Sequence, residues 1–227
     1  VSEASAMANA YSDLAGLDVP EWFSGREDPF DFSYVDVDVE GGLATVLINR
    51  PEAMNALNVT VVRQLGEAIA ELNSRSDVDT IVLEGAGKAF VAGADVKFFV
   101  DMIANDSFDK VYDFTAHGHE VLNAIESSPK TTIAMTTGLA LGGGLELALS
   151  CDYRIGTEKT MLRFPETSIG IFPGLGGTQR TTRICGIEAA RFAVLPGNFM
   201  DAGTSKALGL ITHPVSYTHL RAHETEA

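Results

Sequence analysis

Two glutamates stand near a glycine triplet in an arrangement that suits carbonyl chemistry. The triplet occupies residues 142–144, Glu146 comes two residues later, and Glu166 follows after another twenty residues. An apolar β-like run precedes the triplet and an apolar helical run follows it, which predicts a strand-to-helix turn with free N–H groups for a developing oxyanion. Glu146 lies three residues past Gly143, so its carboxylate can share a helix face with that N–H group. Two acids and an oxyanion donor are the parts needed to add or remove water next to a carbonyl.

A structural interpretation of the same residues stays open at this point. Glu146 could cap its own helix, and Glu166 could pair with a nearby arginine, with no role in a reaction. The two interpretations differ in whether the elements around the glutamates bring them to one small site.

The elements that must position these residues follow from the hydrophobic pattern. Valines alternate with acidic residues over 35–40, Gly41 and Gly42 provide a tight turn, and 43–48 is the returning strand. Asn58 is expected to open a helix with apolar residues at three- and four-residue steps. Further strands are expected at 80–83, 131–135, 153–155 and 161–164, and further helices at 108–125, 145–151, 189–195 and from 176 onwards. This order predicts a layered α/β fold with its glycine-rich turns on one rim.

Composition excludes several classes of function. The 227 residues carry a net charge of −15, which opposes binding to nucleic acid or to anionic membranes. No run of 18 apolar residues suggests a membrane span, and no secretory signal is recognisable. Cys151 and Cys185 are too few for a disulfide framework, so a reduced, cytoplasmic protein is expected.

Other glycine-rich segments and the histidines give no alternative chemistry. The segment 85–89 has the wrong spacing for a phosphate-binding loop, and the dinucleotide GxGxxG and hydrolase GxSxG patterns are absent. His117 and His119 lie two apart in a helical stretch and point to different faces, so no metal site is expected. The sequence therefore predicts neither a metal nor a separate cofactor.

Five motifs in order resemble the crotonase family, and within it the enoyl-CoA hydratases most of all. They are RPEAMNALN at 50–58, FVAGADVK at 90–97, GGGLE at 142–146, PE at 165–166 and PGLGGTQR at 173–180. The resemblance covers residues 34–212 and implies a spiral of repeated ββα units that binds acyl-CoA thioesters. Its activity would be addition of water to trans-2-enoyl-CoA to give 3-hydroxyacyl-CoA, with coenzyme A as part of the substrate.

The resemblance also implies roles for individual residues. The N–H groups of Ala94 and Gly143 would form the oxyanion hole, and Glu146 and Glu166 would hold the water and deliver a proton to the α-carbon. The residues expected to line the substrate path are Glu52, Ala53, Met54, Asp95, Val96, Lys97 and Gly174. A homotrimer or a dimer of trimers is the assembly that the family implies.

The two ends depart from the family pattern. The segments 32–34 and 96–100 most resemble the hydratase part of archaeal proteins that fuse a 3-hydroxyacyl-CoA dehydrogenase ahead of it. This resemblance implies that the acidic residues 1–33 are a linker between the two domains. The catalytic core is expected at 34–213. Residues 214–227 do not resemble the family's closing helices, so a poorly ordered, non-family or artefactual tail on a truncated chain is expected.

Two alternatives to hydration remain. One is a double-bond isomerase of the same fold, which usually needs one carboxylate; the other is a non-catalytic scaffold or RNA binder. The acyl chain length depends on how the apolar residues Phe98, Phe99, Met102, Ile103 and Phe172 pack.

Overall fold

The computed structural model describes residues 33–216 of the chain. Residues 1–32 and 217–227 lie outside this range, and with them nearly all of the predicted linker and most of the predicted tail. The strands are β1 (Val35–Glu40), β2 (Leu43–Ile48), β3 (Thr80–Gly85), β4 (Ala89–Ala92), β5 (Thr131–Thr136), β6 (Leu139–Leu141), β7 (Tyr153–Gly156), β8 (Met161–Arg163), β9 (Met200–Asp201) and β10 (His213–Pro214). The α-helices are α3 (Val59–Ser74), α4 (Val96–Ala104), α5 (Phe108–Glu126), α6 (Gly143–Leu149), α7 (Gly177–Cys185), α8 (Ile187–Val194) and α9 (Ala202–Ala207). Two short 3-10 turns are η1 (Pro51–Ala53) and η2 (Glu166–Ile169).

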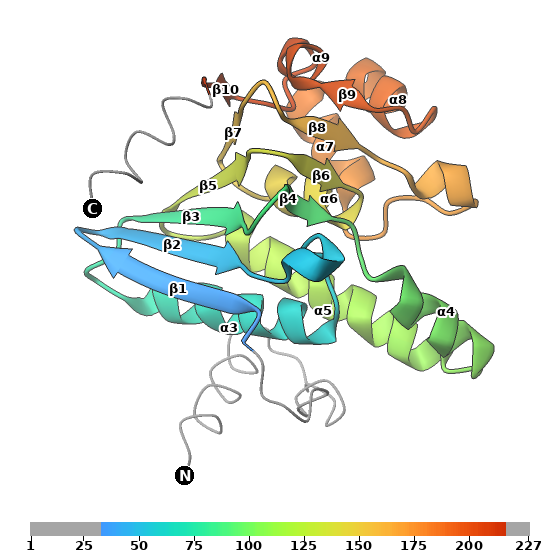
Figure 1. The fold of residues 1–227 in the computed structure, drawn as a ribbon, viewed down its shortest axis with the longest axis horizontal. Coiled ribbons are helices and arrows are strands. Elements are labelled where there is room, and N and C mark those ends of the chain that lie inside the picture. Colours follow the sequence, from blue (N-terminus) through green and yellow to red (C-terminus); the bar gives the residue numbers. More distant parts are fainter. Residues whose placement is uncertain (1–32, 217–227) are drawn as a thin grey trace.

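Two sheets share the strands in a regular alternation. The larger sheet has the order β1-β2-β3-β5-β7-β10, and the smaller one has the order β4-β6-β8-β9. In each of the consecutive pairs β3/β4, β5/β6 and β7/β8, the first strand lies in the larger sheet and the second lies in the smaller sheet. Helices connect one pair to the next (Figure 1). Strands β3, β5 and β7 run parallel to one another in the larger sheet, and β4, β6 and β8 do so in the smaller sheet, where β9 pairs antiparallel with β8. The predicted α/β spiral of ββα units is therefore confirmed.

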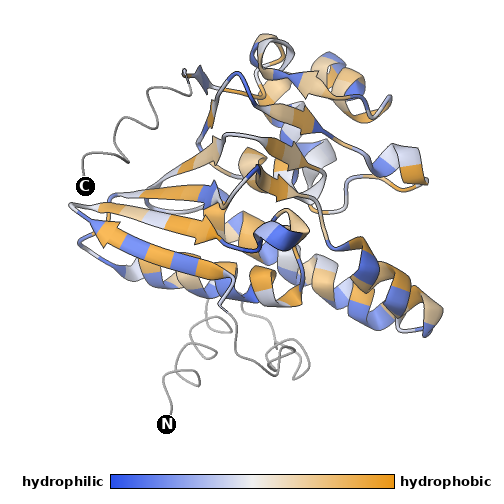
Figure 2. Ribbon diagram, in the orientation of Figure 1, coloured by the Kyte–Doolittle hydropathy of each residue, from blue (hydrophilic) through white to orange (hydrophobic). Residues whose placement is uncertain are grey.

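Local patterns explain the first elements of the spiral. The Asn58 side chain accepts a 2.8 Å hydrogen bond from the N–H of Val61, so it caps α3 as expected. Alternating residues of β2 are fully buried, and β1 forms the edge of the sheet, where blue and orange bands alternate along the strand (Figure 2). Val37 of β1 is nevertheless 45% exposed, because an edge strand has less of the core to cover it. Helices α3 and α5 pack against each other and cover one face of the larger sheet (Figure 1).

Several elements differ from the expectation. The segment 96–104 forms α4, which the sequence did not predict, and the Asp95 side chain caps it by accepting from the N–H of Lys97. Helix α6 begins at Gly143, two residues before the predicted start, and ends at Leu149. Gly144 lies directly against the carbonyl of Val91, where a Cβ would collide, so this position of the helix requires glycine. Strands β4, β6 and β9 and helix α9 were also not predicted.

The expected boundary between residues 213 and 214 falls inside β10. Pro214 pairs with Gly156 of β7, and the N–H of Val215 donates a 2.8 Å hydrogen bond to the Gly156 carbonyl. The first residues assigned to the tail are thus part of the larger sheet. Within residues 33–216, no helix is both long and apolar enough to cross a membrane.

Candidate functional site

Glu146 is a buried carboxylate that is held by the start of another helix. Its Oε1 atom accepts 2.7 Å hydrogen bonds from the N–H groups of Leu175 and Gly177, and Gly177 is the first residue of α7. The carboxylate therefore lies at the positive end of the α7 macrodipole. The structural interpretation in which Glu146 caps its own helix, α6, is wrong. One carboxylate oxygen is fixed by the loop, and the second remains for another partner.

The close fit at Gly177 depends on the absence of a side chain. A Cβ at this position would lie 2.9 Å from Oε1 of Glu146 and 2.7 Å from the ring of Phe164. Because both neighbours are buried, neither can move away freely. Glycine at 177 is what allows the carboxylate to reach the two N–H groups.

Glu166 approaches the same place from a separate loop. It is the first residue of η2, and only 8% of it is exposed. Its Oε1 lies over the glycine turn, because a Cβ on Gly142 would be 2.6 Å from this atom. Its Oε2 is buried and has no hydrogen-bond partner among residues 33–216. A buried carboxylate oxygen without a partner is costly, which suits an atom that meets a bound molecule.

Burial raises the pKa of both carboxyl groups. Burial, the largest influence, together with the charge of Glu166 raises the pKa of Glu146 to about 7. The N–H groups of Gly177 and Leu175 and the charge of Arg180 oppose this rise. Burial also raises the pKa of Glu166, while the charge of Arg163 opposes it. One proton can thus be shared between two acids near neutral pH.

The backbone at Ala94 and Gly143 meets beside these carboxylates. A Cβ on Gly143 would be 3.6 Å from the backbone nitrogen of Ala94. Gly143 is the first residue of α6, so its N–H has no acceptor within the helix. The N–H of Leu57 donates a hydrogen bond to the Gly93 carbonyl, and the N–H of Asp95 donates one to the Leu57 carbonyl. Because successive N–H groups of an extended segment point in opposite directions, the N–H of Ala94 points away from Leu57.

The two segments expected to line the substrate path also come together. The N–H of Ala92 donates to the carbonyl of Met54, and Arg50 joins the ends of the segments by a 2.9 Å ion pair with Asp95. Ala53 is half-buried on η1, whereas most of the other side chains of both segments are more open to solvent. Glu52, Met54, Val96 and Lys97 are exposed, and Asp95 is half-buried.

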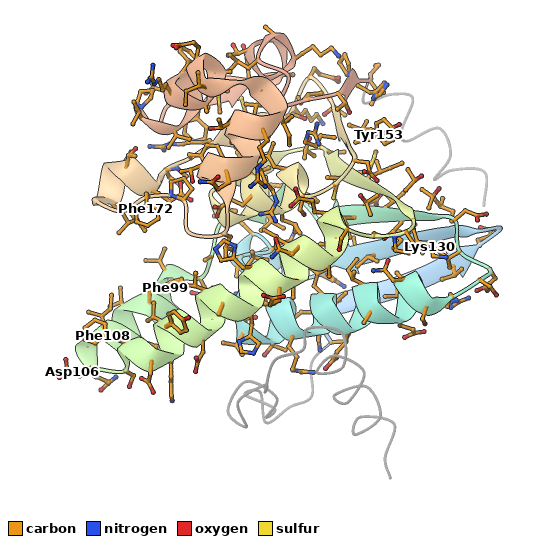
Figure 3. The ribbon with its side chains drawn as sticks, turned by 180° about the vertical axis from the view of Figure 1, so that it is seen from behind. Phe99, Asp106, Phe108, Lys130, Tyr153 and Phe172 are labelled. Carbon is orange, nitrogen blue, oxygen red and sulfur yellow. The ribbon has the colours of Figure 1, made fainter. Side chains whose placement is uncertain are left out.

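Gly174 and the apolar residues lie at one end of the molecule. A Cβ on Gly174 would meet no atom within 4 Å, so this glycine borders open space. Phe99 and Phe172 lie toward the same side, where α4 and α5 project from the core (Figure 3). Phe98 packs tilted and Phe99 packs edge-on against buried Phe114, while Phe172 is 72% exposed. The phenylalanines of α4 are therefore ordered by the core, and Phe172 is not.

Sequence reasoning missed two supporting residues of the site. Asn55 is fully buried at a positive φ of 59°, and its Nδ2 donates to the carbonyls of Ala86, Ala89 and Phe90. Arg180 is a buried arginine whose guanidinium binds the loop that holds Glu146. Asn55 and Arg180 each lie inside a motif. Their roles could have been predicted only if these polar side chains had been expected to be buried.

A separate pocket lies where turns join the two strands of each pair. Its volume is about 200 Å³, and it contains none of the predicted site residues. The lining residues are Gly87, Lys88, Thr137, Gly138, Leu139 and Lys159. Among the described residues, no group of three His, Cys, Asp or Glu side chains could hold a metal ion.

Comparisons with known proteins agree with this geometry. The family model for enoyl-CoA hydratase/isomerase matches residues 43–226. A crotonyl-CoA hydratase of Syntrophomonas wolfei is 36% identical over 185 residues, covering 81% of this chain and 70% of the relative. A short-chain-enoyl-CoA hydratase of Clostridium acetobutylicum is 36% identical over 191 residues, covering 84% and 72%.

Solved structures show the same arrangement of elements. The crystal structure of an enoyl-CoA hydratase from Bacillus anthracis aligns with a TM-score of 0.79 and 32% identity, covering 86% of this chain and 74% of that one. An enoyl-CoA hydratase from Thermoplasma volcanium aligns with a TM-score of 0.77 and 30% identity, covering 87% and 77%. Family model, relatives and structures cover the segments that carry both glutamates and both glycine turns. This chain therefore belongs to the enoyl-CoA hydratase/isomerase family.

Proposed function

We propose that this chain is an enoyl-CoA hydratase, which adds water across the double bond of trans-2-enoyl-CoA to give 3-hydroxyacyl-CoA. The observation that carries the proposal is the pairing of two buried carboxylates, Glu146 and Glu166, beside the backbone of Ala94 and Gly143. The named hydratases among its relatives support the same reaction.

The thioester carbonyl is proposed to lie against the N–H groups of Ala94 and Gly143. When water adds at the β-carbon, negative charge develops on the carbonyl oxygen as an enolate. Two fixed N–H donors stabilise this charge more than they stabilise the neutral carbonyl, which lowers the barrier. Loss of one such donor typically costs about 3 kcal/mol of transition-state stabilisation.

The two glutamates are proposed to divide the proton transfers. Burial raises the pKa of both groups and the charge of Glu166 adds to the rise at Glu146, which favours a state with one ionised and one neutral carboxyl near neutral pH. The ionised group takes a proton from the attacking water, whose oxygen bonds to the β-carbon. The neutral group gives a proton to the α-carbon, so the pair ends with the same total number of protons.

Coenzyme A is proposed to enter as part of the substrate, with no separate cofactor. Ala53, with its neighbours Glu52 and Met54, would lie against the adenine end, and residues 95–97 would follow the pantetheine arm. The hydrogen bond from the Ala92 N–H to the Met54 carbonyl and the ion pair of Arg50 with Asp95 keep the two segments near each other, which supports this path. Gly174 would leave room for the acyl group near Glu166.

The setting of the enzyme is part of the same proposal. A reducing, cytoplasmic compartment suits the free thiols of Cys151 and Cys185. The homotrimer stays a prediction, which light scattering of the purified chain can check. Large apolar side chains exposed on α8, such as Ile187 and Phe192, are consistent with association.

Steady-state hydration tests the proposed function directly. Loss of the enoyl-thioester absorbance measures water uptake by crotonyl-CoA and by longer trans-2-enoyl-CoA substrates. Glu146→Gln and Glu166→Gln are each expected to lower kcat by about 100-fold or more, because each removes a proton-transfer group. Binding of acyl-CoA, measured by calorimetry, should persist in both variants.

A matched control separates this effect from a general loss of charge. Glu188 is an exposed glutamate on α8, and Glu188→Gln should retain wild-type turnover. Near-full hydration by either site variant would contradict the two-carboxylate mechanism. Double-bond migration without water uptake in the wild type would favour the isomerase alternative.

A further inference from the structure

Arg180 is a buried cation on α7 that touches neither carboxylate of the site through a hydrogen bond. Only 4% of its side chain is exposed, so its charge must be compensated by partners within the protein. All three nitrogens of the guanidinium donate to protein groups. Their acceptors lie on two different parts of the fold, which makes Arg180 a connection between them.

One side of the guanidinium holds the loop that binds Glu146. Nη1 donates a 2.8 Å hydrogen bond to the carbonyl of Leu175, the residue whose N–H binds Oε1 of Glu146. The same nitrogen packs against Gly176, where a Cβ would be 2.5 Å from it. The backbone N–H of Arg180 also donates to the Gly176 carbonyl, and the next N–H, that of Gly177, binds Glu146. Both N–H groups that hold Glu146 are thus adjacent to backbone that Arg180 fixes.

The other side of the guanidinium is anchored to the last turn of α5. Nε donates a 2.8 Å hydrogen bond to Oε2 of Glu126, and Nη2 donates one of 2.8 Å to Oδ1 of Asn123. Helix α5 reinforces the loop by packing, because a Cβ on Gly118 would be 2.7 Å from Leu175. A long helix of the core therefore supplies the rigid support, and Arg180 transmits it to the loop.

We infer that Arg180 is a positioning residue for hydration, fixing the 174–177 loop on α5 so that its N–H groups hold the Glu146 carboxylate in place. This inference rests on the proposed function, because it assigns Arg180 a part in orienting one of the two proposed proton-transfer groups. The position of a proton-transfer group matters steeply, since a displacement of about 1 Å can cost 100-fold in rate.

The charges that face Glu146 also favour this role. They are the carboxylate of Glu166 from η2 and the guanidinium of Arg180 from α7, and the strands β4, β5 and β6 next to α6 carry no titratable side chain. Burial, the largest influence, raises the pKa of Glu146, and the charge of Arg180 opposes it. Removal of the guanidinium therefore removes both the anchor of the loop and a charge that keeps the carboxylate ionised.

Steady-state hydration of crotonyl-CoA as a function of pH tests the inference with two substitutions. Arg180→Met should lower kcat by about 10-fold or more with a smaller change in KM, and should shift upward the apparent pKa near 7 in the pH profile of kcat/KM. Arg180→Lys keeps a positive charge but lacks the planar guanidinium whose three nitrogens donate to three separate acceptors. It should leave that pKa closer to the wild-type value while kcat stays low.

Arg191→Met serves as the matched control. It removes an exposed arginine that pairs with Glu188 on α8, and it should leave kcat and the pH profile unchanged. Circular dichroism establishes that each variant is folded. A folded Arg180→Met protein with wild-type kcat and an unshifted pKa would overturn the inference; if this variant does not fold, wild-type kcat in Arg180→Lys would do so. Hydration by the wild-type protein is measured in the same experiment. If the wild type does not hydrate crotonyl-CoA, the result contradicts the proposed function and not the role of Arg180.

Discussion

At the scale of single residues, Gly143 combines two requirements of the site. It is the first residue of α6, where a helix does not use the N–H, and it has little room for a side chain. A Cβ here would lie 3.3 Å from Leu57 and 3.4 Å from Leu175, both at the flexible ends of their side chains. The same position therefore supplies a free N–H and a close approach for a carbonyl oxygen.

Gly143→Pro and Gly143→Ala separate these two requirements. Both add a Cβ, but only proline removes the N–H, and proline is tolerated at the first position of a helix. Gly143→Pro is expected to have a kcat about 100-fold below that of Gly143→Ala, because it loses an oxyanion donor. Hydration kinetics on folded proteins measure the ratio. Equal rates in the two variants would place the oxyanion donor elsewhere.

At the scale of elements, the site is built where the loop before α7 meets α6. The loop contributes Gly174, which borders open space, and Gly177, which is pressed against Glu146 and Phe164. The first turn of α7 supplies one of the two N–H groups, and the preceding loop supplies the other. A small displacement of α7 relative to α6 would therefore move the carboxylate.

The two glycines of this loop are expected to respond oppositely to alanine. Gly177→Ala places a methyl group 2.9 Å from Oε1 of Glu146, so it should lower both kcat and the thermal midpoint. Gly174→Ala meets no atom within 4 Å and should keep the wild-type midpoint. Calorimetry and hydration assays measure both. An undiminished kcat in Gly177→Ala would show that the bonded geometry of Glu146 is not needed for turnover.

At the scale of the whole molecule, burial of Glu146 is expected to reduce stability at neutral and alkaline pH. Its pKa rises from an ordinary value of 4.5 to about 7 on folding. The folded chain therefore binds more protons than the unfolded chain between these values, and the free energy of unfolding falls as the pH rises through this window. The loss is about 3 kcal/mol once the pH exceeds the folded pKa.

Glu146→Gln should recover this loss, because an amide oxygen can accept both N–H bonds without carrying a charge. Urea unfolding is expected to show the variant above wild type in stability at pH 8, by up to about 3 kcal/mol. The difference in free energy of unfolding between Glu146→Gln and wild type should be smaller at pH 5.5, which is still above the isoelectric point of 4.6. Glu188→Gln, at an exposed site, should show no such trend. A gap that does not depend on pH would mean that Glu146 titrates normally in the fold.

The sequence by itself determined the elements whose patterns are local. Strands β1 to β3 and helices α3 and α5 follow from alternation, helical spacing and the Asn58 cap, all of which relate residues a few positions apart. The glycine triplet and the two glutamates were recognisable as a candidate site for the same reason. Helix α4 was missed because it is only nine residues long, which gives few repeats of a helical spacing, and none of its residues is fully buried.

Only the tertiary structure decided how the site is assembled. Glu146 is bound by N–H groups 29 and 31 residues further along the chain, and Arg180 joins residues 54 and 57 positions before it. No local pattern encodes such pairs, because they depend on the path of the whole spiral. The raised pKa of Glu146 likewise depends on burial under α7 and beside Glu166. The residue types specify which chemistry is possible, and the packing of distant segments sets the charge and position of each group.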